Sequence, residues 1–128
     1  KVLKNLDVSS RIFLPGSAGN MSEWYERADL FVLSSSVEGF PNVLLEAMSY
    51  GLPSISFDCD TGPRDMIQDG FNGVLINPED QEKGLIRALE KMIIDIPFRK
   101  SIAENSVSIR EKYSVETIMN KWNNVLDN

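Results

Sequence analysis

The chain has 128 residues, and 13 Lys and Arg against 19 Asp and Glu give it a formal charge of −6. A compact domain of this mass exposes roughly 6,800 Å² of the roughly 21,000 Å² available to the extended chain, so one domain with a buried core is expected. An acidic chain without a basic run disfavours nucleic acid and anionic membrane surfaces as partners. A single cysteine and the absence of His exclude an intramolecular disulfide and remove the commonest zinc ligand and general base.

Four short apolar runs predict β-strands, at residues 11–14, 30–34, 53–58 and 73–76. Their apolar stretches are continuous rather than alternating, which is typical of parallel strands covered on both faces. Helical patterns lie between them at residues 21–28, 41–50 and 63–69. Strands that alternate with helices predict an α/β fold with a parallel sheet and flanking helices.

Beyond residue 76 the pattern is purely helical. Asn77 followed by Pro78 predicts a helix N-cap and first turn. Apolar spacing through residues 85–93, 98–107 and 115–126 then predicts three helices, the last one capped by Ser114.

The first residues predict that the chain is part of a longer protein. Residues 1–6 resemble the tail of a helix, with no Met and no capping residue before them. Four strands also make a thin parallel sheet. We therefore expect residues 1–128 to form a single partial domain.

The most informative segment is residues 34–48. A hydrophobic strand ends in serines, Glu38 and Gly39 follow, and a helix begins at Pro41. In open parallel sheets ligands bind beyond the carboxyl ends of the strands, and a helix that starts there offers unpaired N–H groups to phosphate. Gly39 allows close approach of the backbone to a ligand.

Two acids flank this helix start. Glu46 lies about 7 Å along the helix axis from Pro41, beside the expected cleft, and Glu38 lies on the other side of the helix start. Carboxylates repel phosphate but accept hydrogen bonds from hydroxyls, so a diphosphate between a ribose and a sugar fits the arrangement. In the alternative interpretation Glu38 is a solvated loop acid and Glu46 an exposed helix residue.

Glu38 to Glu46 reproduces the E-x7-E signature of retaining glycosyltransferases with the GT-B fold, and the chain resembles the GT4 (group 1) family. The resemblance extends to residues 30–35, 46–53, 61–67 and 70–75. It runs in order over about residues 11–76, with a looser helical match afterwards. One departure is Asp65, where the family often has Glu.

The resemblance implies a role for each residue of the motif. The first acid, Glu38, is the catalytic residue and contacts the transferred sugar, which also lies against Gly39, Phe40 and Pro41. N–H groups at Asn42, Val43 and Leu44 meet the diphosphate. The second acid, Glu46, holds the ribose hydroxyls.

The implied reaction transfers a sugar from a nucleotide-diphosphate sugar, expected to be UDP-linked, to a hydroxyl of a glycan or lipid-linked acceptor with retention of configuration. The resemblance implies no metal and no cofactor. It also places the acceptor site and a basic phosphate clamp upstream of Lys1, so we expect residues 1–128 alone to be inactive. The alternatives are a non-catalytic nucleotide-binding module and an interaction domain that kept the fold.

The resemblance implies the strand order 3-2-1-4-5-6. In such a sheet, two strands that precede this sequence would lie between the strand predicted at residues 11–14 and the strand predicted at residues 30–34. Exposed strand edges there favour self-association. No apolar run approaches membrane-spanning length and no signal peptide is visible, so we expect a cytoplasmic location, peripheral at the inner face of the membrane in the longer enzyme.

Other candidates border the expected cleft. Gly16 and Ser17 follow a predicted strand and are candidate contacts of the nucleotide base, or part of a flexible turn. Thr61, Gly62 and Arg64 follow another strand, and Arg64 either reaches a phosphate or is a surface charge.

The remaining notable side chains are interpreted as packing residues. Cys59 is expected to be an inert small side chain. The same role is expected for Trp24, Tyr25, Trp122 and the methionines, which occur at helical spacing.

Overall fold

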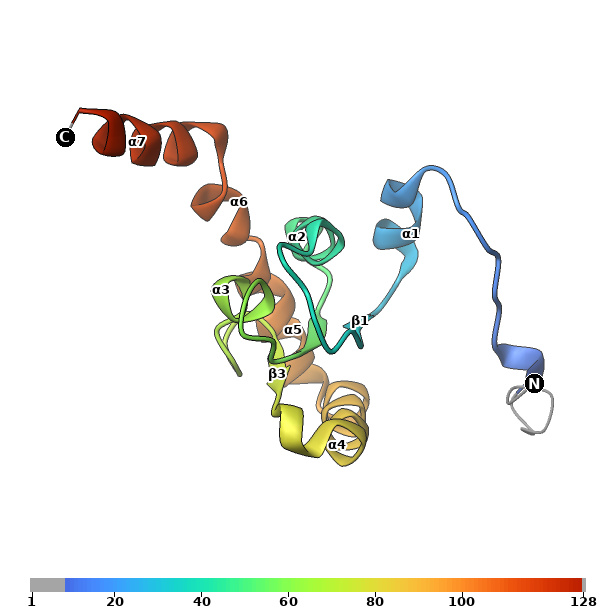
Figure 1. Cartoon of the computed structure of the whole chain (residues 1–128). Coiled ribbons are helices and arrows are strands. Elements are labelled where there is room, and N and C mark those ends of the chain that lie inside the picture. The colour runs from blue at the N-terminus through green and yellow to red at the C-terminus, as the bar shows by residue number, and fades with distance from the viewer. Residues whose placement is uncertain (1–8, 128) are drawn as a thin grey trace.

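The computed structural model describes residues 9–127 (Figure 1). It contains a parallel sheet of three strands in the order β1-β2-β3. The strands are β1 (Phe31–Leu33), β2 (Ser54–Phe57) and β3 (Val74–Ile76). Phe31 pairs with Ser54, and Ile55 pairs with Val74. The predicted parallel α/β fold is confirmed.

Helices connect and cover these strands. In chain order they are α1 (Met21–Arg27), α2 (Asn42–Ser49), α3 (Pro63–Met66), α4 (Gln81–Ile94), α5 (Ile96–Ser106), α6 (Ile109–Lys112) and α7 (Val115–Leu126). The short 3₁₀-helix η3 (Pro78–Asp80) leads into α4. The predicted caps are present: the Asn77 side chain accepts a hydrogen bond from the Glu79 N–H, and the Ser114 side chain accepts one from the Thr117 N–H.

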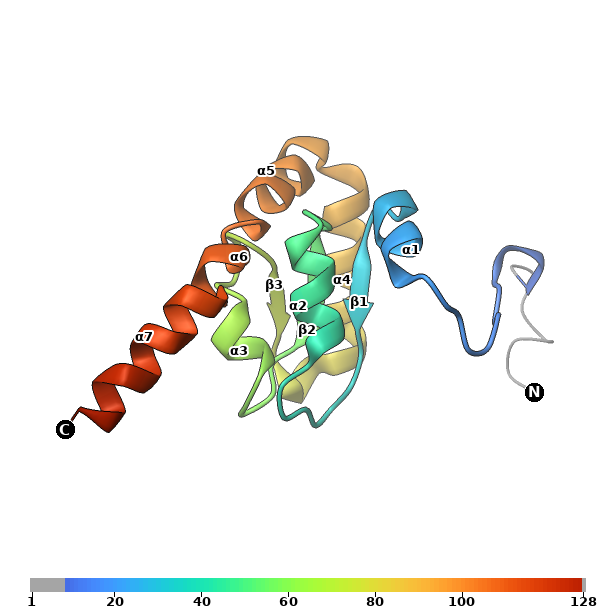
Figure 2. The ribbon, with the colours of Figure 1, turned by 90° about the horizontal axis from the view of Figure 1, so that it is seen from above.

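The two faces of the sheet carry different side chains, because β2 alternates large and small residues. Ile55 and Phe57 pack against α4 and α5 on one face. The other face presents Ser54 and Ser56, both fully buried, and their small side chains let α2 approach the sheet closely. Figure 2 shows α2 and α4 on opposite sides of the sheet. The start of α2 is thereby fixed at the carboxyl end of β1.

The strand predicted at residues 11–14 is wrong. A 3₁₀-helix, η2 (Ser9–Arg11), occupies its start, and the rest has no regular structure. Phe13 is 80% exposed and Leu14 79% exposed. A strand needs a neighbour for its backbone hydrogen bonds, and β1 pairs only with β2 among the described residues. The helix tail predicted at residues 1–6 lies outside the described residues.

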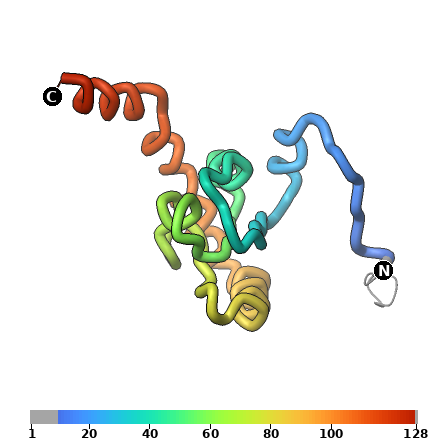
Figure 3. The backbone as a smooth tube through the Cα atoms, in the orientation of Figure 1, coloured from blue at the N-terminus to red at the C-terminus, as the bar shows by residue number. Residues whose placement is uncertain are grey.

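The two ends of the described chain leave the body on opposite sides (Figures 2 and 3). The accessible surface of 9073 Å² is therefore larger than the roughly 6,800 Å² of a compact domain of this mass. Helix α7 has no buried residue, and its Trp122 is 58% exposed, so the packing role predicted for Trp122 is wrong. Trp24 is also half-exposed, as are Met21 and Met119, whereas Tyr25, Met48, Met66 and Met92 are buried as predicted.

None of the helices within residues 9–127 has the length and apolar character needed to cross a membrane.

Candidate functional site

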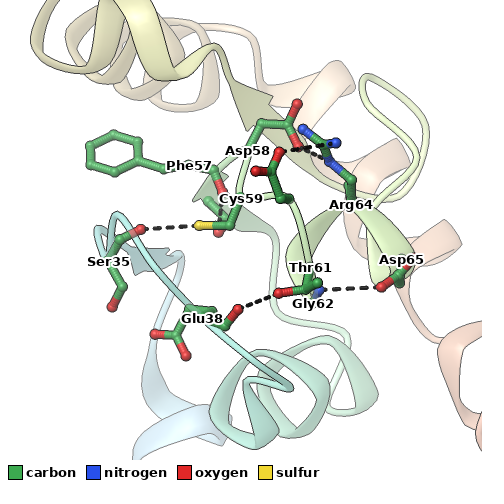
Figure 4. A network of polar contacts seen from close by, with 11 residues as sticks. Ser35, Glu38, Phe57, Asp58, Cys59, Thr61, Gly62, Arg64 and Asp65 are labelled. Carbon is green, nitrogen blue, oxygen red and sulfur yellow. Dashed lines mark hydrogen bonds and ion pairs between the residues drawn. The ribbon is translucent and has the colours of Figure 1, made fainter.

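Two loops that follow neighbouring strands meet at the start of α2 and α3. The Thr61 hydroxyl donates a hydrogen bond of 2.6 Å to the main-chain carbonyl of Glu38 (Figure 4). Gly62 has a φ of +85°, and a Cβ placed on it would lie 2.5 Å from the carbonyl oxygen of Gly39 and 2.7 Å from Cδ of Pro41. The structure thus joins the Glu38–Pro41 loop tightly to the beginning of α3.

The side chain of Glu38 is not used by this contact. Figure 4 shows its carboxylate pointing away from Thr61, while only its carbonyl faces the second loop. Glu38 is half-buried. Its carboxylate therefore remains available to hydroxyl groups of a ligand at this loop.

Cys59 contacts the start of the loop that follows β1. Its thiol is buried and donates a hydrogen bond of 3.5 Å to the Ser35 carbonyl. Burial raises the pKa of the Cys59 thiol, and the nearby Glu38 and Asp58 carboxylates raise it further. A protonated, buried thiol agrees with the predicted packing role.

The first turn of α2 presents unpaired N–H groups. Pro41 is the N-cap, no side chain caps the helix, and its first turn contains no acid. The Leu44 N–H donates to the Pro41 carbonyl at 3.0 Å, and Leu44 is fully buried. The N–H groups of Asn42 and Val43 have no acceptor within the described part of the chain. Of the three candidate diphosphate contacts, Asn42 and Val43 are thus the open donors at the positive end of the helix.

Glu46 lies in the next turn of α2 and has a partner on α1. The Tyr25 hydroxyl donates a hydrogen bond of 3.1 Å to Oε2 of Glu46. Tyr25 is only 5% exposed, although Glu46 itself is exposed. This contact was missed from the sequence, because helical spacing identifies Tyr25 as buried but does not say which turn of α2 its hydroxyl meets.

We expect Tyr25 to ionise unusually late, although burial also raises the pKa of Tyr113. Burial, and then the hydrogen bond to Glu46, raise the pKa of Tyr25 from 10.0 to about 12. Since the folded state holds this proton more tightly than the unfolded state, its contribution to stability is complete below pH 10 and declines as the pH rises toward 12. Ultraviolet titration should show a component that ionises near pH 12 in the native chain and is lost in Tyr25→Phe. A native chain whose tyrosines all ionise near pH 10 would contradict the contact.

Arg64 does not point toward the Glu38–Pro41 loop (Figure 4). Its Nε donates to Oδ1 of Asp58 at 2.9 Å, and its Nη1 lies 3.5 Å from Oδ1 of Asp60. The hydrogen bond to Asp58 raises the pKa of Arg64 above its ordinary value. In this conformation its charge is balanced by aspartates rather than open to a phosphate.

Gly16 and Ser17 stand apart from the two acids. They lie in the exposed segment before α1, where Gly16 has a φ of +77°. No hydrogen bond or ion pair joins them to Glu38 or Glu46 within residues 9–127. Their role as base contacts stays a prediction.

Phe40 packs against Tyr113, the residue that directly follows α6. The rings of Tyr113 and Phe40 meet edge to face with centroids 5.4 Å apart. The Tyr113 hydroxyl and the Lys112 ammonium both donate to the Asp65 carbonyl. The Asp65 carboxylate accepts from the Gly62 N–H at 3.2 Å, so Asp65 caps the short helix α3. Neither the cap at Asp65 nor its contacts with Lys112 and Tyr113 was predicted from the sequence.

Glu38 is half-buried and Glu46 is exposed, so both can be reached from the surface. A hollow of about 430 Å³ is lined by Glu23, Trp24, Arg27 and Ala28 on α1, away from the start of α2. The candidate site is therefore the surface around Glu38 and Glu46. In the part of the chain that the structure describes, no three His, Cys, Asp or Glu side chains gather as a metal site.

Comparison with known proteins identifies the family. The model of the family described as "Glycosyl transferases group 1" matches residues 1–108. This chain belongs to that family. The Glu38 to Glu46 segment therefore lies within a glycosyltransferase group 1 sequence, as its E-x7-E spacing suggested.

Relatives and solved structures agree with this assignment. The chain is 33% identical over 123 residues to the amylovoran biosynthesis glycosyltransferase AmsD of Erwinia amylovora, covering 96% of this chain and 34% of AmsD. Over 47 residues, 37% of this chain and 13% of the relative, it is 64% identical to a lipopolysaccharide 1,6-galactosyltransferase of Salmonella typhimurium. The structure of Alr3699/HepE from Anabaena in complex with UDP matches with a TM-score of 0.83 and 25% identity, over 98% of this chain and 34% of that one.

This group 1 chain thus spans about a third of the length of the first of these relatives.

Proposed function

We propose that this chain is the donor-binding part of a retaining glycosyltransferase that uses a nucleotide-diphosphate sugar, with UDP as the nucleotide. The observation that carries the proposal is the first turn of α2, where the open N–H groups of Asn42 and Val43 lie between the carboxylates of Glu38 and Glu46 along the chain. The structure of Alr3699/HepE, a relative of similar fold, is a complex with UDP, which supports this choice of nucleotide.

In the proposed binding mode the positive end of α2 faces the diphosphate, and the two carboxylates face hydroxyl groups of the ligand. The diphosphate lies against the N–H groups of Asn42 and Val43, where the helix dipole is positive and no acid stands in the first turn. Glu46 accepts hydrogen bonds from the ribose, and Glu38 accepts them from the transferred sugar. Gly39, Phe40 and Pro41 form the wall next to that sugar, held by Gly62 and Tyr113.

The chemistry follows from where charge develops. As the bond between the sugar and the diphosphate breaks, negative charge grows on the leaving phosphate, and fixed N–H dipoles at the start of α2 stabilise it. The acceptor hydroxyl attacks from the same face, guided by the leaving phosphate, so the configuration is retained. The acceptor, a glycan or a lipid-linked sugar, is bound by the rest of a longer protein. The reaction needs no metal and no cofactor from this chain.

The sugar itself is suggested by one relative. The 47 matched residues that are 64% identical belong to a protein named lipopolysaccharide 1,6-galactosyltransferase. UDP-galactose is therefore the first donor to assay with the protein expressed from the complete reading frame.

Binding of UDP tests the proposal directly. We expect Glu46→Ala to weaken UDP binding roughly 10-fold or more, the effect of losing a hydrogen bond to a charged group. Isothermal titration of the chain with UDP measures this, and Glu104→Ala, an exposed acid on α5, is the matched control. Equal UDP affinity in Glu46→Ala and the native chain would favour an interaction domain whose acids are surface charge.

A further inference from the structure

Tyr25 is fixed by three elements of the fold. It belongs to α1, and its ring lies edge to face with Phe31 of β1, with centroids 6.3 Å apart. The ring also contacts Tyr50, at the end of α2, with centroids 5.5 Å apart. Since Tyr25 is 5% exposed, its ring has little freedom, and the direction of its hydroxyl is set by packing.

The hydroxyl of this fixed ring engages one oxygen of an otherwise exposed carboxylate. It donates to Oε2 of Glu46 at 3.1 Å, and the two residues are 21 positions apart in the chain. An exposed glutamate on a helix normally samples several rotamers, and a ligand must restrict them on binding. The contact with Tyr25 reduces that freedom before any ligand arrives. It also leaves Oε1 as the carboxylate oxygen that has no hydrogen-bond partner among residues 9–127.

We propose that Tyr25 is a positioning residue that orients Glu46, so that Oε1 accepts a hydrogen bond from a ribose hydroxyl and the site discriminates ribonucleotides from deoxyribonucleotides. This inference rests on the proposed function, because it requires the ribose of a nucleotide to reach Glu46. It adds a residue of α1 to a site otherwise built from the loops after β1 and β2 and from α2.

The test compares UDP with 2′-deoxy-UDP and 3′-deoxy-UDP by isothermal titration. We expect the native chain to bind UDP roughly 10-fold more tightly than the analogue that lacks the bonded hydroxyl. In Tyr25→Phe, UDP affinity should fall roughly 3- to 10-fold, and the preference for UDP over that analogue should shrink to less than about 3-fold.

A double variant shows whether Tyr25 acts through Glu46. Adding Tyr25→Phe to Glu46→Ala should change UDP affinity by less than about 2-fold, because Glu46→Ala removes the acceptor that Tyr25 orients. Tyr50→Phe is the control. It removes a hydroxyl that has no hydrogen-bond partner among the residues described, and it should leave UDP affinity unchanged.

Four outcomes would overturn the inference. Equal loss of affinity for UDP and both deoxy analogues in Tyr25→Phe would show a purely structural role. A gain of UDP affinity in Tyr25→Phe would show that Oε2 is needed free by the ligand. Failure of the native chain to bind UDP at all would refute the proposed function and this inference with it. If the native chain binds UDP and Tyr25→Phe binds it equally well, this inference alone is refuted.

Discussion

Replacing Gly62 by alanine is expected to destabilise the chain by roughly 3 kcal/mol or more, or to prevent folding. The methyl group would lie 2.5 Å from the Gly39 carbonyl oxygen and 2.7 Å from Cδ of Pro41, and the residue already has a φ of +85°. Backbone strain of this kind costs about 1–3 kcal/mol, and forcing an extra carbon into a packed contact costs about as much again. Thermal unfolding measures the effect, with a fall in melting temperature on the order of 10 °C.

Gly70→Ala separates the two contributions. Gly70 has a φ of +73°, but a Cβ placed on it meets no atom within 4 Å. We expect this variant to lose only about 1–2 kcal/mol, the cost of a left-handed backbone for an alanine. If Gly62→Ala and Gly70→Ala lose the same free energy of unfolding, the close approach of the two loops at Gly62 is not part of the folded state.

The second large effect concerns catalysis. We expect Glu38→Gln, in the protein expressed from the complete reading frame, to transfer sugar about 100-fold more slowly than the native enzyme, since a charge placed beside the reacting sugar is lost. UDP affinity should stay within about 3-fold of native, because Glu38 does not face the diphosphate or ribose in the proposed mode. Steady-state transfer from UDP-galactose, together with UDP titration, measures both.

Glu104→Gln provides the matched charge change at an exposed position of α5 and should transfer at the native rate. More than half of native activity in Glu38→Gln would remove this residue from the catalytic role. Loss of UDP binding in Glu38→Gln would instead place it against the nucleotide.

Short-range patterns predicted most of the fold. The apolar runs and the caps at Asn77 and Ser114 depend on neighbours along the chain, and the structure confirms the three later strands and the helical end. The run at residues 11–14 shows the limit of such patterns, because its apolar side chains satisfy strand propensity while no strand beside it completes the hydrogen bonding. Trp122 shows the same limit for a helix, since its spacing is amphipathic but it remains 58% exposed in the described chain.

For the candidate site, too, local features could be predicted from the sequence and contacts between distant segments could not. The order of Glu38, Gly39, Pro41 and Glu46 around a helix start could be predicted, because it follows from one strand, one loop and one helix. The contact of Tyr25 with Glu46 could not, since it depends on how α1 packs against α2. The pairing of Arg64 with Asp58 and Asp60 also depends on the geometry of the loop after β2, which a sequence pattern does not give.

The most direct measurement of the central claim follows the backbone amides of Asn42 and Val43 by nuclear magnetic resonance during titration with UDP and, separately, with uridine. The diphosphate should shift both amide signals, because their N–H groups are the open donors at the start of α2, while uridine at the same concentration should leave them in place. UDP binding that leaves these two signals unchanged, or that shifts only residues such as Glu23 and Arg27 around the hollow on α1, would contradict the account.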